Sequence, residues 1–167
     1  MNCLSPSALL AQNIGEIADF GKVVSMITLK FGGTSMANAR RILASADIII
    51  NRAKEDRLSV VVSAVAGISN TLQSAIDACV SGISGSNYVN DIKNTHNEIC
   101  LELQSKLPGF DADKVMSILQ KNFEELEKLL AGCVSFGECP DTVHCRIMGM
   151  GELLSAPIME NVLLAKK

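Results

Sequence analysis

The chain has 167 residues, a net charge of −3 and 48% hydrophobic residues. This length is enough for one domain with a buried core, and the weakly acidic charge gives no reason to expect a nucleic acid partner. No apolar run is expected to reach the length of a membrane span, so no membrane partner is expected.

Six cysteines and two histidines form no recognisable metal or disulfide pattern. The sequence contains no C-x-x-C pair, and neither His96 nor His144 stands at zinc-ligand spacing from a cysteine. His96 continues the apolar stripe of a predicted helix, which favours a place at the edge of the core. We therefore expect reduced thiols, a cytoplasmic location and no protein metal ligand.

Residues 1–22 are predicted to be an N-terminal extension, helical or disordered, that precedes a domain of residues 23–167. The extension lacks the basic start and the longer apolar segment of a secretory signal.

The first predicted elements are a strand, a glycine turn and a helix. Residues 23–31 are rich in β-branched side chains and predict a buried strand. Gly32 and Gly33 follow, and Ser35 is the expected N-cap of a helix whose apolar residues recur from 39 to 53. Free N–H groups and a positive dipole end suit phosphate, and Lys30 adds a mobile charge. Strand–Gly-Gly–helix is also a common structural connection, and neither the P-loop nor the dinucleotide fingerprint is matched.

A second strand, turn and helix follow. Residues 58–63 form a continuous β-branched run, as in a parallel strand covered on both faces. Ser69 or Asn70 is the expected N-cap of the next helix. The order strand, helix, strand, helix predicts a βαβ unit with helices on both faces of the sheet. Both turns then lie at the carboxyl ends of strands, where open α/β sheets bind ligands.

Two long helices are predicted next. An apolar stripe runs from residue 88 to 107 and ends at Pro108-Gly109. Asp111 is the expected N-cap of the second helix, and Gly132 is expected to stop it. The pair predicts an antiparallel helical insertion on the sheet.

The last motif is Gly151-Glu152-Leu153-Leu154-Ser155. A lone glutamate is most often a solvated carboxylate, so Glu152 by itself indicates little. Pro157 predicts that a helix either starts near Ser155 or is kinked there, because proline removes one helical hydrogen bond.

Three segments in this order resemble motifs of the aspartate kinases in the amino acid kinase family. They are Lys-Phe-Gly-Gly-Thr-Ser at 30–35, the Ser-Ala-x-Ala-Gly-Ile-Thr-Asn loop at 63–70 with Ser69 in place of threonine, and Gly-Glu-x-x-Ser at 151–155. Residues 107–110 and 136–141 resemble the type fused to homoserine dehydrogenase. The resemblance covers residues 26–165 and implies a truncated α/β fold, a three-layer αβα sandwich with a mainly parallel sheet and a helical insertion.

The resemblance implies ATP-dependent phosphorylation of L-aspartate to 4-phospho-L-aspartate, the first step of lysine, threonine and methionine biosynthesis. Lys30 would be catalytic by balancing charge on the transferred phosphate. Gly32 and Gly33 would bind the phosphates of ATP through their N–H groups, with Ser63 at the strand end nearby.

Ser69 and Glu152 would hold the aspartate substrate, Glu152 by pairing with its ammonium group. Mg²⁺ would bind through phosphate oxygens and water, without a protein ligand. The full-length protein is expected to be a homo-oligomer.

Later elements of the family are not found in the 167 residues, among them the Gly-Arg-Gly-Gly-Ser-Asp segment and the nucleotide-base pocket. We therefore expect an incomplete and inactive fragment, with an open sheet edge and an uncovered apolar face. Two alternatives stay open. The chain is another amino acid kinase, such as glutamate 5-kinase, acetylglutamate kinase or uridylate kinase, or it is a non-catalytic relic that only binds partners.

Overall fold

The computed structural model describes residues 26–167. The predicted extension of residues 1–22, and residues 23–25 of the first predicted strand, lie outside this range. The elements are β1 (Met26–Phe31), the 3₁₀ helix η2 (Gly33–Met36), α2 (Ala39–Arg52), β2 (Arg57–Val62), α3 (Ile68–Val80), α4 (Ser86–Lys106), α5 (Ala112–Phe136) and α6 (Asp141–Ala165).

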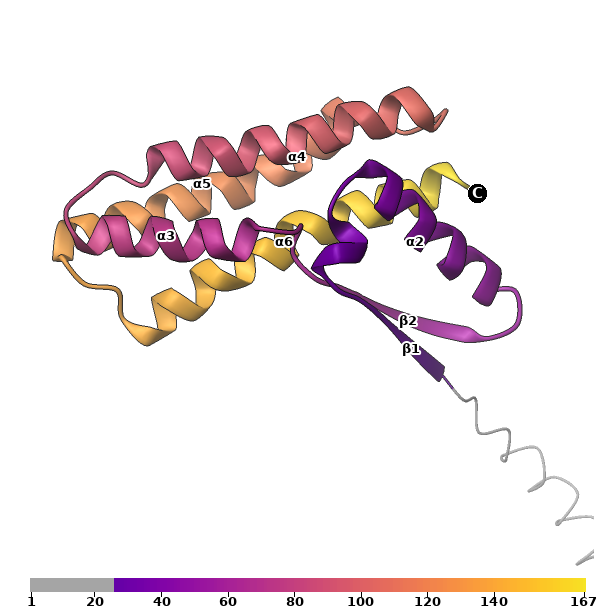
Figure 1. The fold of residues 1–167 in the computed structure, drawn as a ribbon, viewed down its shortest axis with the longest axis horizontal. Coiled ribbons are helices and arrows are strands. Elements are labelled where there is room, and N and C mark those ends of the chain that lie inside the picture. Colours follow the sequence, from indigo (N-terminus) through magenta and orange to yellow (C-terminus); the bar gives the residue numbers. More distant parts are fainter. Residues whose placement is uncertain (1–25) are drawn as a thin grey trace, which may run out of the picture.

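The two predicted strands form a parallel pair, as expected, with Met26 opposite Arg57 and Phe31 opposite Val62. Side chains alternate along β1, so that Phe31 is buried and Lys30 is exposed. The helices α2 and α6 lie on the same side of this sheet (Figure 1). The opposite face, with Lys30, is therefore open in the described part of the chain, where the predicted helices on both faces of the sheet are not found.

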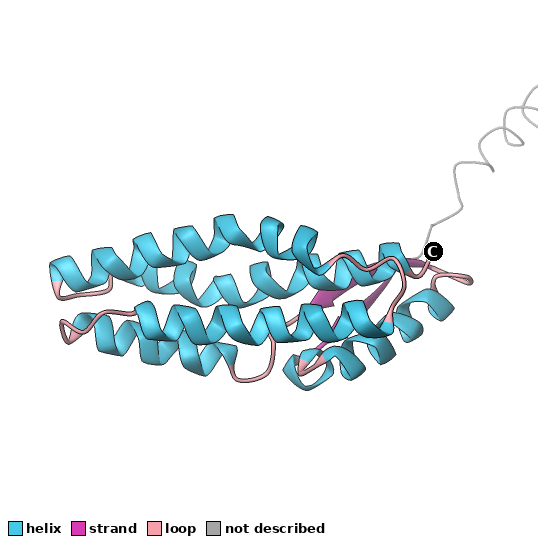
Figure 2. Ribbon diagram, turned by 90° about the horizontal axis from the view of Figure 1, so that it is seen from above, coloured by secondary structure: helices cyan, strands magenta, loops and turns pink. Residues whose placement is uncertain are grey.

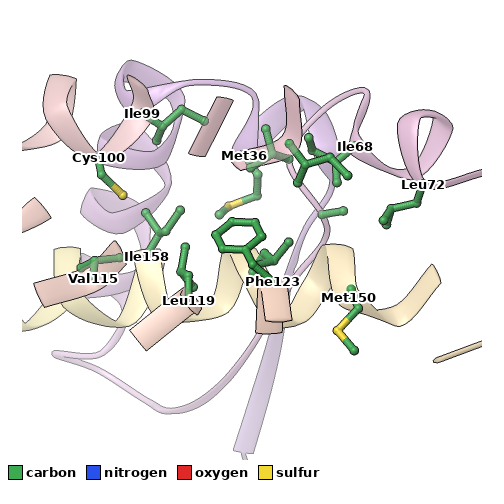
Figure 3. Packing of buried hydrophobic residues seen from close by; sticks show 14 of the residues in the cluster. Met36, Ile68, Leu72, Ile99, Cys100, Val115, Leu119, Phe123, Met150 and Ile158 are labelled. Carbon is green, nitrogen blue, oxygen red and sulfur yellow. The ribbon is translucent and has the colours of Figure 1, made fainter. Parts of the chain in front are cut away.

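The helices α3, α4, α5 and α6 pack side by side as an elongated bundle that extends from the sheet (Figures 1 and 2). Figure 3 shows Phe123 among Met36, Leu119 and Ile158 in the core, and all four side chains are almost fully buried. The predicted helical insertion is thus confirmed as α4 and α5. Asp111 caps α5, because its side chain accepts a hydrogen bond from Lys114 N–H at 2.9 Å.

The predicted N-cap at Ser35 is wrong. Residues Gly33–Met36 form a separate 3₁₀ turn, and α2 starts only at Ala39. Asn38 is the N-cap, with its side-chain oxygen accepting from Arg41 N–H at 3.0 Å. Met36 is fully buried, so packing of the turn decides where the helix begins.

Two further boundaries differ from the prediction. The helix α3 starts at Ile68, before Ser69 and Asn70, and its N-cap is Gly67 at φ +86°, a left-handed conformation that favours glycine. The helix α5 continues past Gly132 and ends before Gly137, which has φ +67°. Cys133 is buried one residue after Gly132, so the apolar face that holds the helix does not end there.

The helix α6 runs without interruption from Asp141 to Ala165, so a helix start near Ser155 is wrong. By length and composition α6 is apolar enough to cross a membrane, which differs from the expectation that no segment reaches this length. Its buried residues, such as Leu154 and Ile158, belong to the core that α6 shares with its neighbouring helices. This packing accounts for the apolar character of α6 within a globular fold.

His96 lies inside the core and not at its edge. Its ring is fully buried, Nδ1 bonds the Ile92 carbonyl at 2.7 Å, and Nε2 has no partner in the described part of the chain. Burial lowers the pKa of His96. Among the buried thiols, burial raises the pKa of Cys100 to about 12.

Candidate functional site

The first two motifs meet where β1 and β2 end. Ser63 N–H donates to the Phe31 carbonyl at 2.9 Å, which extends the parallel pairing by one residue. Gly33 then lies against the second loop, because a Cβ added to it would be 3.4 Å from the Ala64 carbonyl oxygen. Gly32 has open space around it. The glycine turn and the loop after β2 are therefore direct neighbours, as their predicted places at the strand ends require.

The third motif reaches the same point from α6. A Cβ on Gly151 would lie 2.6 Å from the Cβ of Ala64, a distance that real side chains do not adopt. Gly151 is buried in the middle of α6, where glycine lowers helix stability relative to alanine. Its presence is explained by the close approach of α6 to the loop after β2.

Two side chains of α6 hold the peptide unit between Ser63 and Ala64. Ser155 Oγ donates to the Ser63 carbonyl at 2.8 Å, and the Ala64 N–H donates to Glu152 Oε1 at 3.3 Å. Ser155 is fully buried and Ala64 nearly so, while Glu152 is exposed. Buried backbone groups need partners, and here a helix supplies them in place of a neighbouring strand.

Lys30 lies on β1, and no hydrogen bond or ion pair found in residues 26–167 joins its side chain to this cluster. It pairs with Val61 across the sheet, two residues before Ser63, and its side chain is exposed. None of the five ion pairs found in residues 26–167 involves Lys30. Its ammonium group is therefore free to balance an anionic ligand.

Ser69 lies in the first turn of α3 and is exposed. Its hydroxyl makes no hydrogen bond to another residue of the described chain. The structure thus brings Gly33, Ser63 and Glu152 together, with Lys30 on the adjoining strand, whereas Ser69 stays apart from their hydrogen-bonded network.

The sequence reasoning assigned no role to Ser155 or Gly151, although both belong to the third motif. A signal for Ser155 was present, because residues three apart on a helix lie on one face and Ser155 therefore shares a face with Glu152. No signal identified Ala64, whose contribution is a backbone N–H.

The residues present fit the phosphate end of a nucleotide in part. An unpaired lysine and a glycine turn lie at the carboxyl end of β1, and the chemistry of both suits an anion. No cluster of three or more His, Cys, Asp or Glu side chains in residues 26–167 could hold a metal ion.

Sequence comparison finds aspartokinases. The chain is 34% identical over 144 residues to the bifunctional aspartokinase/homoserine dehydrogenase of Buchnera aphidicola, covering 84% of this chain and 17% of that protein. It is 31% identical over 134 residues to the chloroplastic aspartokinase 1 of Arabidopsis thaliana, covering 78% of this chain and 22% of that protein. No family model matches the chain. The chain thus spans only about a fifth of the length of these relatives.

Structure comparison agrees at the level of the fold. Escherichia coli aspartokinase III, in a complex with aspartate and ADP, aligns with a TM-score of 0.69 at 24% identity, over 85% of this chain and 29% of that one. This likeness confirms the predicted α/β fold over the matched part. The chain is a homologue of the N-terminal kinase part of the aspartokinases, both stand-alone and fused to homoserine dehydrogenase.

Proposed function

We propose that this chain supplies one side of an aspartate kinase active site, for the ATP-dependent phosphorylation of L-aspartate to 4-phospho-L-aspartate. The observation that carries the proposal is the meeting of three motifs, distant in sequence, around the Ser63–Ala64 peptide at the carboxyl ends of two parallel strands. Such an edge is where open α/β sheets bind ligands. A cytoplasmic location and a place in lysine, threonine and methionine biosynthesis follow from this proposal.

The phosphate side of the site is assigned to the first motif. Lys30 would balance the charge that develops on the transferred phosphate, and the backbone N–H groups of Gly32 and Gly33 would hold phosphate oxygens. Ser63 would contribute at the end of β2. ATP would supply the phosphoryl group, and Mg²⁺ would bind through phosphate oxygens and water.

The substrate side is assigned to Glu152 and Ser69. The Glu152 carboxylate is exposed, and within residues 26–167 its one hydrogen bond is to Ala64 N–H, so it has capacity left for an ammonium group. Ser69 would donate its hydroxyl to a carboxylate oxygen of aspartate. Holding the two substrates in register is the main source of rate in this class of reaction.

A chimera tests the proposal. Residues 26–165 would replace the matching segment of Escherichia coli aspartokinase III, and ADP release that depends on L-aspartate would be measured. We expect turnover in the chimera and its loss on Glu152→Gln, which removes the charge and keeps the size of the side chain. A folded chimera that binds ATP but does not phosphorylate aspartate would contradict the proposal.

A further inference from the structure

The peptide unit that joins Ser63 to Ala64 is the first unit beyond β2, and both of its polar groups bond to α6. Its carbonyl accepts from Ser155 Oγ at 2.8 Å, and its N–H donates to Glu152 Oε1 at 3.3 Å. In a trans peptide these two groups point in opposite directions. Two side chains of α6 therefore hold one peptide unit, Ser155 through its carbonyl and Glu152 through its N–H.

We propose that Ser155 is a positioning residue, which fixes the Glu152 carboxylate through the Ser63–Ala64 peptide. One oxygen of Glu152 is then occupied by Ala64 N–H, and the other is aimed at the ammonium group of an amino acid substrate. The statement that the second oxygen faces a substrate rests on the proposed function, whereas the positioning of the carboxylate does not.

The hydroxyl of Ser155 has one proton and two acceptors within reach. The Ser63 carbonyl lies at 2.8 Å and the Glu152 carbonyl, three residues earlier in α6, at 3.2 Å. The shorter contact joins α6 to the loop, and Ser155 is fully buried. Without this hydroxyl the Ser63 carbonyl would lose its donor, and the peptide would be free to turn away from α6.

Turning the peptide would move the Ala64 N–H as well, because both groups belong to one rigid plane. The Glu152 side chain is exposed, and no other hydrogen bond or ion pair in the described chain restrains its carboxylate. Its position therefore depends on Ala64 N–H, and the position of Ala64 N–H depends on Ser155.

The Ala64 amide reports this arrangement in the whole 167-residue chain. Its signal in ¹H–¹⁵N NMR spectra of a dilute sample is followed between about pH 3 and pH 7, the range in which glutamate ionises. We expect a shift that follows the ionisation of Glu152 and disappears in Glu152→Gln. The side-chain amide oxygen introduced by that substitution still accepts from Ala64 N–H, so amide exchange stays slow in the variant.

Ser155→Ala tests the positioning role. The pH-dependent shift of Ala64 is expected to fall at least about twofold, and its amide exchange to become about tenfold faster, because the peptide then keeps only its bond to Glu152. Ser155→Cys keeps the shape with a weaker donor and should give intermediate values. Ser105→Ala is the matched control, since Ser105 Oγ bonds only the Glu102 carbonyl of its own helix, at 2.7 Å.

The proposal would be overturned if Ala64 in Ser155→Ala kept the shift amplitude and the amide exchange rate that it has in the unchanged chain. It would also be overturned if the Ala64 signal of the unchanged chain did not follow Glu152. A titration of the chimera with Escherichia coli aspartokinase III, in which the rest of the site is present, separates the two levels; L-aspartate is compared with succinate, which lacks the ammonium group. If the folded chimera does not bind L-aspartate more tightly than succinate while Ser155→Ala acts as expected in the 167-residue chain, the positioning of the carboxylate stands and the proposed function fails.

Discussion

Asn122 of α5 donates its side-chain amide to the carbonyl of Leu153 in α6, at 3.2 Å. Leu153 lies four residues before Pro157, which has no N–H to donate to that carbonyl. The side chain of one helix thus replaces the hydrogen bond that proline removes from another. This hydrogen bond explains why α6 continues through Pro157. The carbonyl that it satisfies belongs to Leu153, the residue after Glu152.

A double-mutant cycle tests this replacement. We expect Asn122→Ala to lower the free energy of unfolding by about 1 kcal/mol, because a helix carbonyl loses its donor. In a Pro157→Ala background the drop in the free energy of unfolding caused by Asn122→Ala should be at most about half as large, since residue 157 then donates its own N–H to the Leu153 carbonyl. Urea unfolding followed by circular dichroism measures both, and Asn94→Ala, a helical change in α4 without a cross-helix bond, is the control. Equal losses in the two backgrounds would contradict the replacement.

The approach of α6 to the loop after β2 gives a second prediction. Gly151→Ala should destabilise the chain by about 1–3 kcal/mol, because its Cβ would meet that of Ala64 at 2.6 Å and neither backbone yields easily. Gly149→Ala is the matched change in the same helix, and nothing lies within 4 Å of its added Cβ. It should instead stabilise by about 0.5–1 kcal/mol through helix propensity. Thermal unfolding of both variants would refute the close approach if Gly151→Ala were as stable as Gly149→Ala.

The strands and the helical insertion could be predicted from the sequence because their signals are local. Runs of β-branched residues predicted β1 and β2, and the latter is displaced by one residue from its prediction. The signals for helix ends were ambiguous. Ser35 and Asn38 are both good N-caps, and the burial of Met36 decides between them. Gly132 predicts a helix end, but the apolar stripe of α5 continues to Cys133 and outweighs the cost of one glycine.

The sequence predicts the side chains of the site and the N–H groups of Gly32 and Gly33, and the structure adds the peptide between Ser63 and Ala64. Gly33 and Ser63 meet as their places at strand ends require, whereas only the family resemblance placed Glu152 near them. The role of Ser155 depends on a peptide 92 residues away in sequence, and no periodicity encodes such a pairing. A long-range hydrogen bond of this kind is visible only once the fold is known.

His96 predicts how stability depends on pH. Burial lowers its pKa in the folded chain, so that below the unfolded pKa of about 6.5 the unfolded chain binds more protons. The contribution of His96 to the free energy of unfolding should therefore be constant above this pH and fall as the pH drops below it. His96→Leu should reduce that fall, and His144→Gln, which keeps His96, should retain it. Unfolding midpoints at several pH values measure the difference, and an unchanged pH profile in His96→Leu would contradict it.

Lys30 carries a prediction for catalysis in the chimera with Escherichia coli aspartokinase III. Lys30→Ala should lower kcat by about a hundredfold or more and leave the KM for aspartate nearly unchanged, because the lysine is assigned to charge that develops during transfer. Lys54→Ala removes an exposed lysine whose amine bonds Asn51 at the end of α2, and should have no effect. Wild-type kcat in Lys30→Ala would remove the lysine from the phosphate side of the site.

The last prediction is that the 167-residue chain by itself does not phosphorylate aspartate. It aligns with 29% of aspartokinase III, and the face of the sheet that carries Lys30 is open in the described residues. An apolar groove of about 340 Å³ between β2 and α6, lined among others by Val60, Val62 and Met159, is likewise uncovered.

Positioning is strongly non-additive, so one side of a site should give far less than half of the rate. The open strand edges and the groove should also make the chain associate, which sedimentation at increasing concentration would detect. The assay is ADP release with and without L-aspartate, with aspartokinase III as the positive control. Steady aspartate-dependent ADP release by the purified chain would contradict the prediction and would mean that the rest of the site is either dispensable or supplied by a second copy.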